Sequence, residues 1–388
     1  MASATPRAVA SRLRPAWAEI DLGAITHNAR VLSELVAPAE LCAVVKAWAY
    51  GHGPVQAAEA ALYGGATRLA VALVEEGCML RSAEITEPVL VLSEPPAAAF
   101  PEVVASDLTP TLYTFEGVES AAKAVAASGR DEPLPVHVKV DTGMHRVGAS
   151  PDAAPAVVRA VAGHPELQLE GLYTHFAVAD EPARDDFTAG QLTQLRQVAD
   201  RLAESGIRPA LLHAANSAGA IAHPAARLDL VRCGIALYGQ APSPELASAA
   251  TVPALRPALS FKARVSYVKE VPAGEGVSYG LRYTTPADTV VATVPLGYAD
   301  GVPRRLAAAG GEVLVGGRRC PIAGTVTMDQ LTVDCGPGAS VAAGDEIVLI
   351  GRQGGEAITA WEWAQRTGTI AYEILCGVSQ RVPRTYIR

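Results

Sequence analysis

The chain has 388 residues, which exceeds the usual size of a single domain, so we expect two domains. Hydrophobic residues make up 49% and charged residues 19%, a composition that can bury a large core and excludes a disordered chain. The formal net charge is −8 and no long run of Lys or Arg occurs, which excludes nucleic acid as the expected partner.

The cysteines and the apolar runs indicate where the protein works. Six cysteines are scattered with no CxxC motif and no Cys/His pairing, so we expect free thiols in a reducing compartment and neither a disulfide framework nor a metal site. The segment 1–15 lacks the continuous apolar core of a secretory signal, and the apolar runs elsewhere are shorter than a membrane span. We therefore expect a soluble, cytoplasmic protein that does not contact membranes.

Between about residues 40 and 240, eight short runs rich in Val, Leu and Ile alternate with Ala-rich helical patterns. This alternation predicts βαβ units that close into a (β/α)₈ TIM-like barrel, and the continuous apolar character fits strands covered on both faces. An open doubly wound sheet is the alternative, but no GxGxxG follows the first strand. The expected strands are Leu41–Lys46, Arg68–Leu73, Val89–Ser93, Thr109–Thr114, Val136–Val140, Gln168–His175, Ala210–His213 and Leu228–Leu237.

After about Thr251 the pattern changes to strand-like segments separated by turns that carry Gly and Pro. Helical pattern is sparse there, apart from about Thr359–Thr367, so we expect a second, mostly β domain. The stretch Gly239–Pro257 contains four prolines and is the expected boundary, which gives domains at 1–250 and 251–388. The expected strands are Ala258–Val271, Thr289–Pro295, Glu312–Val315, Gln330–Asp334 and Glu346–Ile350.

A lysine ends the first expected barrel strand. Active sites of such barrels lie at the carboxyl ends of the strands, and Lys46 stands there with Tyr50, Gly51 and Gly53 close behind it. Lys46 could extend past the rim into water, or it could be a desolvated amine that forms a Schiff base. Tyr50 and the two glycines favour the second interpretation, because they offer a hydroxyl and a close backbone approach beside the amine.

Two further strand ends carry cations and a histidine. Lys139 and Arg146 follow the fifth strand, where they could bind an anion or orient a phenolate, or could form a surface salt bridge with Asp141. His175 follows the sixth strand. A single His is more often a core residue than a catalytic one, but this one falls at the active end of the same barrel.

The loops after the last two strands are where phosphate-binding barrels hold their phosphate. Ser217 follows the seventh strand, and the eighth contains Arg232 and continues into Gly234 and Ile235, so a hydroxyl and backbone N–H groups are available there. A lysine on the first strand and a phosphate site on the last two predict a phosphorylated aldehyde, and pyridoxal phosphate fits that description. A sugar-phosphate aldolase would share both features, so the barrel alone leaves the two open.

An ordered set of motifs spans about residues 17–388: AVVKAWAYGHG, KVDTGMHRVG, THFAVAD, NSAG, VRCGIALYG, GVSYG, PLGYADG, TMDQ and AYEI. Any one of them is weak evidence, but the whole set in this order resembles the alanine racemase family. The resemblance implies a pyridoxal-phosphate-dependent isomerase of L- and D-alanine, with a TIM-like barrel, a β-rich C-terminal domain and a homodimer whose active sites are shared. It also implies a supply of D-alanine for peptidoglycan in the cell wall.

The resemblance assigns a role to each matching position. It implies that Lys46 and Tyr279 are the two catalytic bases, with Lys46 also holding the cofactor as a Schiff base and Tyr279 coming from the partner subunit. Arg146 is implied to contact the ring phenolate and to serve the substrate site, and Lys139 resembles a lysine that is carbamylated in many members. Arg232 is implied to face the pyridine nitrogen with His175 behind it. The implied phosphate ligands are Tyr50, Ser217, Gly234, Ile235 and Tyr372, and Met328 and Tyr298 are implied to line the substrate pocket from across the interface.

Racemisation removes a proton from one face of Cα and returns one to the other, so two bases on opposite faces suit it. The choice of Arg232 is informative, since a guanidinium keeps its protons and does not readily leave one on the pyridine nitrogen. A carboxylate at that position would keep the ring protonated and favour transamination.

Three positions depart from the family pattern. Trp48 stands where a small polar residue is general, and Thr325 and Thr327 stand where Arg and Cys are common. Trp48 is read as a packing change or as a change in pocket volume, and Thr325 bears on the approach to the site. These departures keep a broad-specificity amino-acid racemase open. A related decarboxylase would need a carboxylate in place of Arg232, and a non-catalytic pyridoxal-phosphate carrier would lack the second domain.

Overall fold

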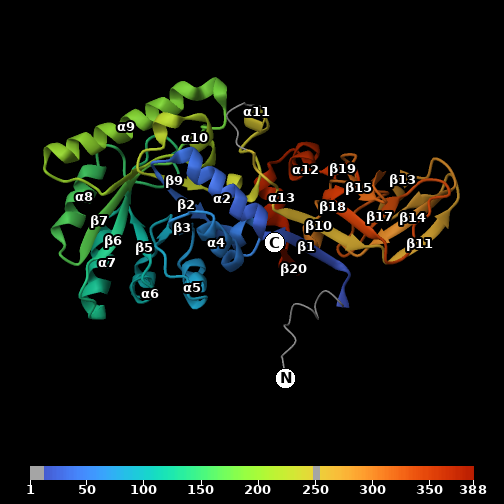
Figure 1. The fold of residues 1–388 in the computed structure, drawn as a ribbon, viewed down its shortest axis with the longest axis horizontal. Helices are drawn as coiled ribbons and strands as arrows, with labels where there is room; N and C mark the ends of the chain where they lie inside the picture. The colour runs from blue at the N-terminus through green and yellow to red at the C-terminus, as the bar shows by residue number, and fades with distance from the viewer. Residues whose placement is uncertain (1–12, 248–253) are drawn as a thin grey trace. The chain divides into compact units, whose positions relative to one another are not determined.

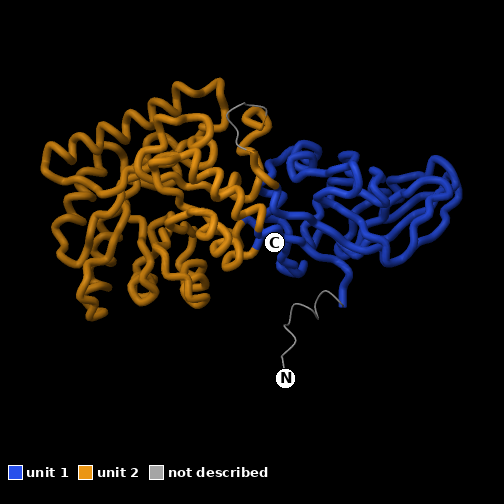
Figure 2. Tube along the Cα trace, viewed as in Figure 1, with its two compact units in different colours: residues 1–22, 50–52, 257–388 blue, residues 23–49, 53–256 orange. Residues whose placement is uncertain are grey.

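The computed structural model describes residues 13–247 and 254–388, which form two compact units (Figure 2). We call the unit of residues 23–49 and 53–256 the barrel unit, and the unit of residues 13–22, 50–52 and 257–388 the β unit. The segment 1–15 and the proline-bearing stretch 239–257, on which two of the sequence predictions rest, lie partly outside the described residues. The domain division at residue 250 stays a prediction, and the structure adds that the first strand, β1 (Ala16–Asp21), groups with the C-terminal residues.

The barrel unit contains the predicted eight-stranded sheet, in which every neighbouring pair is parallel and β9 returns to lie beside β2 (Figure 1). The remaining seam, between β8 and β9, is bridged by two backbone hydrogen bonds: Asp229 N–H donates to the Leu212 carbonyl at 3.1 Å and Arg232 N–H to the Ala215 carbonyl at 3.0 Å. The TIM-like fold class is therefore confirmed. The strands are β2 (Glu40–Val44), β3 (Arg68–Val71), β4 (Val89–Val91), β5 (Thr109–Leu112), β6 (Leu134–Lys139), β7 (Leu167–Tyr173), β8 (Leu211–His213) and β9 (Leu230–Cys233).

The connecting helices lie around the outside of the sheet (Figure 1). In α9 (Asp185–Glu204), Leu192, Leu195, Val198 and Leu202 repeat at three- and four-residue spacing and are buried. No helix within the described residues combines the length and apolar character needed to cross a bilayer. The other α-helices of this unit are α2 (Leu22–Val36), α4 (Pro54–Tyr63), α5 (Val74–Ser82), α6 (Phe100–Ala105), α7 (Phe115–Ser128), α8 (Ala154–Gly163), α10 (Ser217–Ala222) and α11 (Pro244–Ala247).

One predicted strand is shorter than its apolar run. The sequence predicts a strand over Leu228–Leu237, whereas β9 ends at Cys233 and Ile235–Tyr238 form a 3₁₀ helix, η4. The side chains of η4 are all buried, and a continuous apolar run does not distinguish a buried strand from a buried helical turn. The turn brings the backbone N–H groups after β9 to a helix start, which matters for the site below.

The β unit is mostly β, as expected. Its largest sheet has the order β16-β15-β18-β10-β1-β20, with β1 antiparallel to β10 and parallel to β20, so the two ends of the chain meet in one sheet. The single predicted strand Ala258–Val271 is two strands that join different sheets. The elements are β10 (Leu259–Arg264), β11 (Tyr267–Val271), β12 (Gly276–Val277), β13 (Tyr283–Thr284), β14 (Thr289–Val294), β15 (Glu312–Val315), β16 (Arg318–Pro321), β17 (Leu331–Asp334), β18 (Glu346–Gln353), β19 (Glu356–Ile358), α12 (Ala360–Thr367), α13 (Ala371–Gly377) and β20 (Arg384–Ile387).

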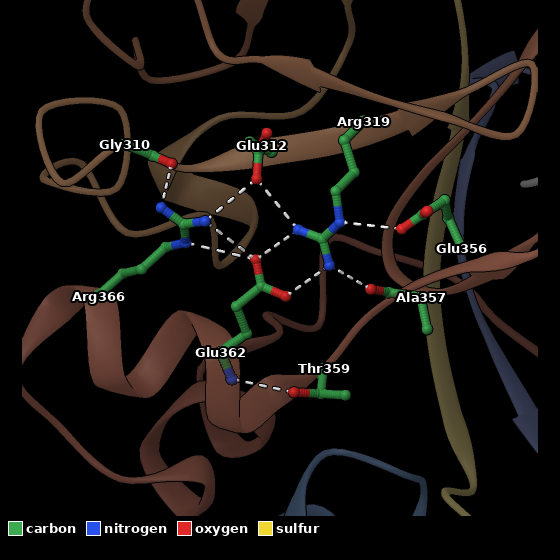
Figure 3. Close-up of polar contacts among 8 residues, drawn as sticks. All are labelled: Gly310, Glu312, Arg319, Glu356, Ala357, Thr359, Glu362 and Arg366. Carbon is green, nitrogen blue, oxygen red and sulfur yellow. Dashed lines mark hydrogen bonds and ion pairs between the residues drawn. The ribbon is translucent and has the colours of Figure 1, made fainter.

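An ion-pair network joins α12 to the edge of this sheet (Figure 3). Arg319 on β16 donates two hydrogen bonds to Glu362 on α12, at 2.8 and 2.9 Å, and one to Glu312 on β15 at 3.0 Å. Arg366 lies one helical turn after Glu362 and donates to Glu312 at 3.1 Å. The hydrogen bonds to Glu362 and Glu312 raise the pKa of Arg319, and the Arg319 guanidinium lowers the pKa of Glu362, so the network stabilises both charged forms.

Candidate active site

The carboxyl ends of the barrel strands bring most of the predicted site residues of this unit together. Lys46 lies two residues after the end of β2, Lys139 is the last residue of β6, and His175 lies two residues after the end of β7. Ser217 starts α10 after β8, and Arg232 lies within β9. Since all eight strands are parallel, these positions share one end of the barrel.

Lys46 does not simply continue its strand. It starts a short left-handed turn, α3 (Lys46–Tyr50), in which Ala47, Trp48 and Ala49 have φ values of 53°, 57° and 51°. Such a conformation costs an L-residue roughly 1–2 kcal/mol, so contacts elsewhere must hold the turn. Trp48, the first departure from the family pattern, is half-buried within it. Lys46 therefore stands directly before three residues in the left-handed conformation.

Arg232 is buried, with 2% of its surface exposed, and its hydrogen-bond partners are uncharged groups. Its guanidinium donates to His213 Nδ1 at 2.6 Å and to the carbonyls of Thr174 and Ala214 at 2.8 and 3.1 Å, and it lies 3.3 Å from His175 Nδ1. Burial and the nearby guanidinium lower the pKa of both histidines well below the ordinary value, so both are neutral near pH 7. Arg232 therefore keeps a positive charge among neutral partners.

A hydrogen-bond chain runs from Arg232 back through the barrel interior. His213 Nε2 lies 2.8 Å from His137 Nδ1, and His137 Nε2 lies 2.9 Å from Glu170, which also pairs with Arg68 at 2.8 Å. Because a guanidinium has only donors, His213 accepts at Nδ1 and must carry its proton on Nε2. His137 then accepts from His213 and donates to Glu170. The chain fixes both tautomers and sets the orientation of Arg232.

The sequence analysis did not identify His213, His137 or Glu170. The available signal was that each of the three is a polar residue within an expected buried strand. His175, which the resemblance implied to lie behind Arg232, contacts the guanidinium, but His213 makes the shorter contact.

Lys139 is buried beside other cations. Only 5% of its surface is exposed, and burial, followed by Arg146 and Arg232, lowers the pKa of its ammonium to about 8. The Asp141 carboxylate instead accepts the N–H groups of Gly143 and His145, both at 3.0 Å. Within the described residues, Asp141 forms no ion pair with Lys139 or Arg146, so the surface salt bridge considered from the sequence does not occur. The result is a cluster of positive charge suited to an anionic ligand.

The loops after β8 and β9 are joined at Ser217. This serine is buried, and its Oγ accepts the Gly234 N–H at 3.0 Å and the Ala236 N–H at 3.4 Å. Gly234 precedes η4, and Ile235 is the first residue of η4, so the starts of two helical turns, α10 and η4, meet at this hydroxyl. Backbone N–H groups at helix starts favour anions, and the phosphate site predicted here stays a prediction.

The β unit gathers the remaining predicted residues in two places. The rings of Tyr50 and Tyr372 lie 6.2 Å apart between centroids. Separately, Tyr279, Tyr298 and Met328 are 74%, 42% and 52% exposed, although each is large and partly apolar.

One loop, residues 324–329, forms hydrogen bonds with the backbone at both Tyr279 and Tyr298. The Thr325 hydroxyl donates to the Tyr279 carbonyl at 2.8 Å, and the Ser278 hydroxyl donates to the Thr325 carbonyl at 2.7 Å. The Tyr298 N–H donates to the Thr327 carbonyl at 2.9 Å. Of the two departures from the family pattern in this loop, the Thr325 side chain therefore holds the backbone at Tyr279, whereas the Thr327 side chain donates to the Gln330 carbonyl at 2.8 Å.

Comparisons with known proteins identify the same family for both parts of the chain. The family model for the N-terminal domain of alanine racemase matches residues 20–242, and the one for the C-terminal domain matches residues 258–386. An alanine racemase of Symbiobacterium thermophilum is 46% identical over 374 residues, covering 96% of this chain and 97% of that protein. This chain belongs to the alanine racemase family. The predictions of family, of fold class and of a racemase are confirmed.

Solved structures of an alanine racemase and of a histidine racemase share the fold of this chain. The alanine racemase of Streptomyces coelicolor A3(2) superimposes with a TM-score of 0.92 at 42% identity, covering 98% of this chain and 99% of that one. A histidine racemase from Leuconostoc mesenteroides superimposes with a TM-score of 0.88 at 31% identity, covering 97% and 98%. Proteins of this fold that bear different substrate names are therefore similar to this chain.

Proposed function

We propose that this protein interconverts L- and D-alanine with pyridoxal phosphate as its cofactor and supplies D-alanine for peptidoglycan synthesis in the cytoplasm. The observation that carries the proposal is Arg232, a buried cation whose partners are two imidazoles and two carbonyl oxygens. Arg232 lies on β9, at the same end of the barrel at which Lys46 follows β2 and Ser217 follows β8. The family match over both domains supports the same activity.

The residues present fit the cofactor. An amine at Lys46, a cluster of cations around Lys139, and N–H donors near Ser217 suit an aldehyde that carries a phosphate and a phenolate. Lys46 would hold the aldehyde carbon, Arg146 the phenolate, and Arg232 the pyridine nitrogen. The phosphate would be held by Tyr50, Ser217, Gly234, Ile235 and Tyr372.

When bound, pyridoxal phosphate supplies an electron-accepting ring that makes the Cα–H of an attached amino acid acidic. Arg232 would offer that ring a hydrogen bond and keep its own proton, which would limit charge build-up at the nitrogen and favour return of a proton to Cα. In one direction the Lys46 amine would remove a proton from one face of Cα and the Tyr279 phenol would return one on the other face. Each turnover would leave a Lys46 ammonium and a Tyr279 phenolate, the forms that the reverse direction needs.

We propose further that each site is shared between the two chains of a homodimer. The support is the exposure of Tyr279, Tyr298 and Met328, three large side chains that a partner surface would cover. In this arrangement Tyr279 serves as the partner's second base, and Tyr298 and Met328 line the partner's substrate pocket. The arrangement has a strict consequence for mixtures of variants.

Lys46→Ala and Tyr279→Phe homodimers should each be nearly inactive, because every site lacks one base. Mixed heterodimers would contain one site without either base and one intact site, so activity should recover toward half of the wild-type value per heterodimer. If both bases come from one chain, no recovery occurs. Mass spectrometry of the mixture must establish that subunits have exchanged.

The substrate assay follows D-isomer formation from L-alanine, with L-serine, L-lysine and L-histidine in parallel. Alanine should be the preferred substrate. A broad-specificity racemase is the second candidate, favoured by Trp48 beside Lys46 and by the likeness to a histidine racemase. Comparable kcat/KM for several amino acids would select it, and formation of no D-isomer from any of them would refute the racemase proposal. In that case a bound but unreactive cofactor would indicate a carrier protein.

A further inference from the structure

The turn that carries Lys46 is strained and needs an external partner. Ala47, Trp48 and Ala49 occupy the left-handed region, with φ, ψ of 53°, 53°, of 57°, 38° and of 51°, 52°. Within the turn, Ala49 N–H donates to the Val45 carbonyl at 2.9 Å, and Gly53 N–H donates to the Trp48 carbonyl at 2.9 Å. Neither contact engages the N–H of Ala47, the residue directly after Lys46.

That N–H donates to a carboxylate on α5, the helix that follows β3. Ala47 N lies 2.7 Å from Oε1 of Glu76, in the first turn of α5. The second oxygen, Oε2, accepts the N–H groups of Ala72 and Leu73, at 2.8 and 3.2 Å. One half-buried carboxylate therefore joins the loop after β2 to the loop after β3, with three charge-assisted hydrogen bonds.

A helix-capping role explains only part of this arrangement. An acidic residue three positions after the N-cap commonly accepts the N-cap N–H, and Oε2 of Glu76 does so at Leu73. The contact of Oε1 with Ala47 lies outside α5 and adds nothing to that cap. It ties down the first peptide of a strained turn, next to the predicted Schiff-base lysine.

We infer that Glu76 is a positioning residue, which holds the left-handed turn so that the Lys46 amine meets the cofactor aldehyde. The role of Lys46 in this inference rests on the proposed function, whereas the contact between Glu76 and Ala47 is independent of it. When that contact is lost, the turn is free to relax toward right-handed or extended backbone, because its residues carry Cβ atoms that disfavour the left-handed region. Lys46 then samples positions away from the aldehyde.

The barrel offers a matched control. Glu94, after β4, also links two successive loops, since its carboxylate accepts the N–H groups of Tyr113 and Thr114 after β5, at 2.6 and 2.9 Å. Glu94→Gln removes an equivalent carboxylate from loops that do not carry Lys46. Any effect shared by both variants reports loop stability in general, and an effect confined to Glu76 reports the Lys46 turn.

Two variants separate the capping role from the positioning role. Aspartate is one methylene shorter than glutamate, so Glu76→Asp keeps a carboxylate at the start of α5 while withdrawing it from Ala47. Glu76→Gln keeps the side-chain length but replaces one acceptor oxygen with an N–H₂ group, which cannot accept a hydrogen bond from a backbone N–H. Ala47→Gly, added to either variant, lowers the cost of positive φ and should restore part of what is lost.

Three measurements on the full-length chain are informative. The exchange rate of the Ala47 amide proton, by NMR, should rise at least about tenfold in Glu76→Asp and Glu76→Gln and stay near wild type in Glu94→Gln. The dissociation constant for pyridoxal phosphate should weaken by about tenfold or more in the same two variants. The yield of pyridoxyl group trapped on Lys46 by borohydride should fall with it, and Ala47→Gly should recover both.

Unchanged Ala47 exchange in both Glu76 variants overturns the inference. So does faster exchange with unaltered cofactor affinity, or an equal loss of affinity in Glu94→Gln. If wild-type protein traps no pyridoxyl group on Lys46, the proposed function fails instead. The Ala47 exchange rates and the reactivity of Lys46 toward an acylating reagent then decide whether Glu76 positions this lysine.

Discussion

Carbon dioxide should react with Lys139 in preference to other lysines. A neutral amine adds CO₂ to give a carbamate and releases one proton, so the reaction needs the deprotonated form. Burial and the cations Arg146 and Arg232 lower the pKa of Lys139 to about 8 from its ordinary value of 10.5. At pH 7 the neutral fraction is then about 9% rather than about 0.03%, an advantage of about 300-fold. The carbamate would also replace a buried cation with an anion that can pair with Arg146.

The assay is ¹³C NMR of the protein in ¹³C-labelled bicarbonate, following the carbamate carbon. The signal should be present in wild type, absent in Lys139→Gln, and present in Lys123→Gln, which alters an exposed lysine on α7. Because the folded-state pKa is depressed, the initial rate at fixed dissolved CO₂ should rise about tenfold per pH unit below 8 and level off above it. A rate that keeps rising toward pH 10, or a signal that survives Lys139→Gln, refutes the reasoning.

Three further predictions concern Arg232, Thr325 and Glu362. Arg232→Glu should slow racemisation by about 10²–10³-fold and raise the transamination side product, measured as pyruvate; slower racemisation with no added pyruvate contradicts the argument for a guanidinium. Thr325→Val removes the hydrogen bond to the Tyr279 carbonyl, which is worth about 1 kcal/mol, so kcat should fall several-fold while the affinity for the cofactor stays unchanged. Thr325→Ser keeps the hydroxyl and should restore kcat. Glu362→Gln should lower the free energy of unfolding by about 1–2 kcal/mol in denaturant titrations, less so in high salt, because Arg319 loses its two-pronged partner; an equal loss at all salt concentrations contradicts an ionic origin.

Patterns local in the sequence determined the barrel. Each of the eight apolar runs overlaps a strand of the barrel, because short buried parallel strands leave a continuous apolar signal between helical patterns. The same rule placed Lys46, Lys139, His175 and Arg232 at one end of the barrel, since parallel strands share their carboxyl ends. The family resemblance, carried by ordered motifs, was confirmed, while the individual roles of the site residues stay predictions.

Contacts between distant segments decided the rest. The strand Ala16–Asp21 pairs with residues more than two hundred positions away, so its short alternating pattern gave no sign of its partner. The hydrogen-bond chain from Arg232 to Glu170 forms only because four strands, β6, β7, β8 and β9, bring these side chains together inside the barrel, and the histidine tautomers follow from those contacts. The left-handed turn after Lys46 opposes the intrinsic preference of its own residues. Tertiary contacts such as the hydrogen bond from Ala47 to Glu76 hold this turn, and a local sequence pattern does not reveal them.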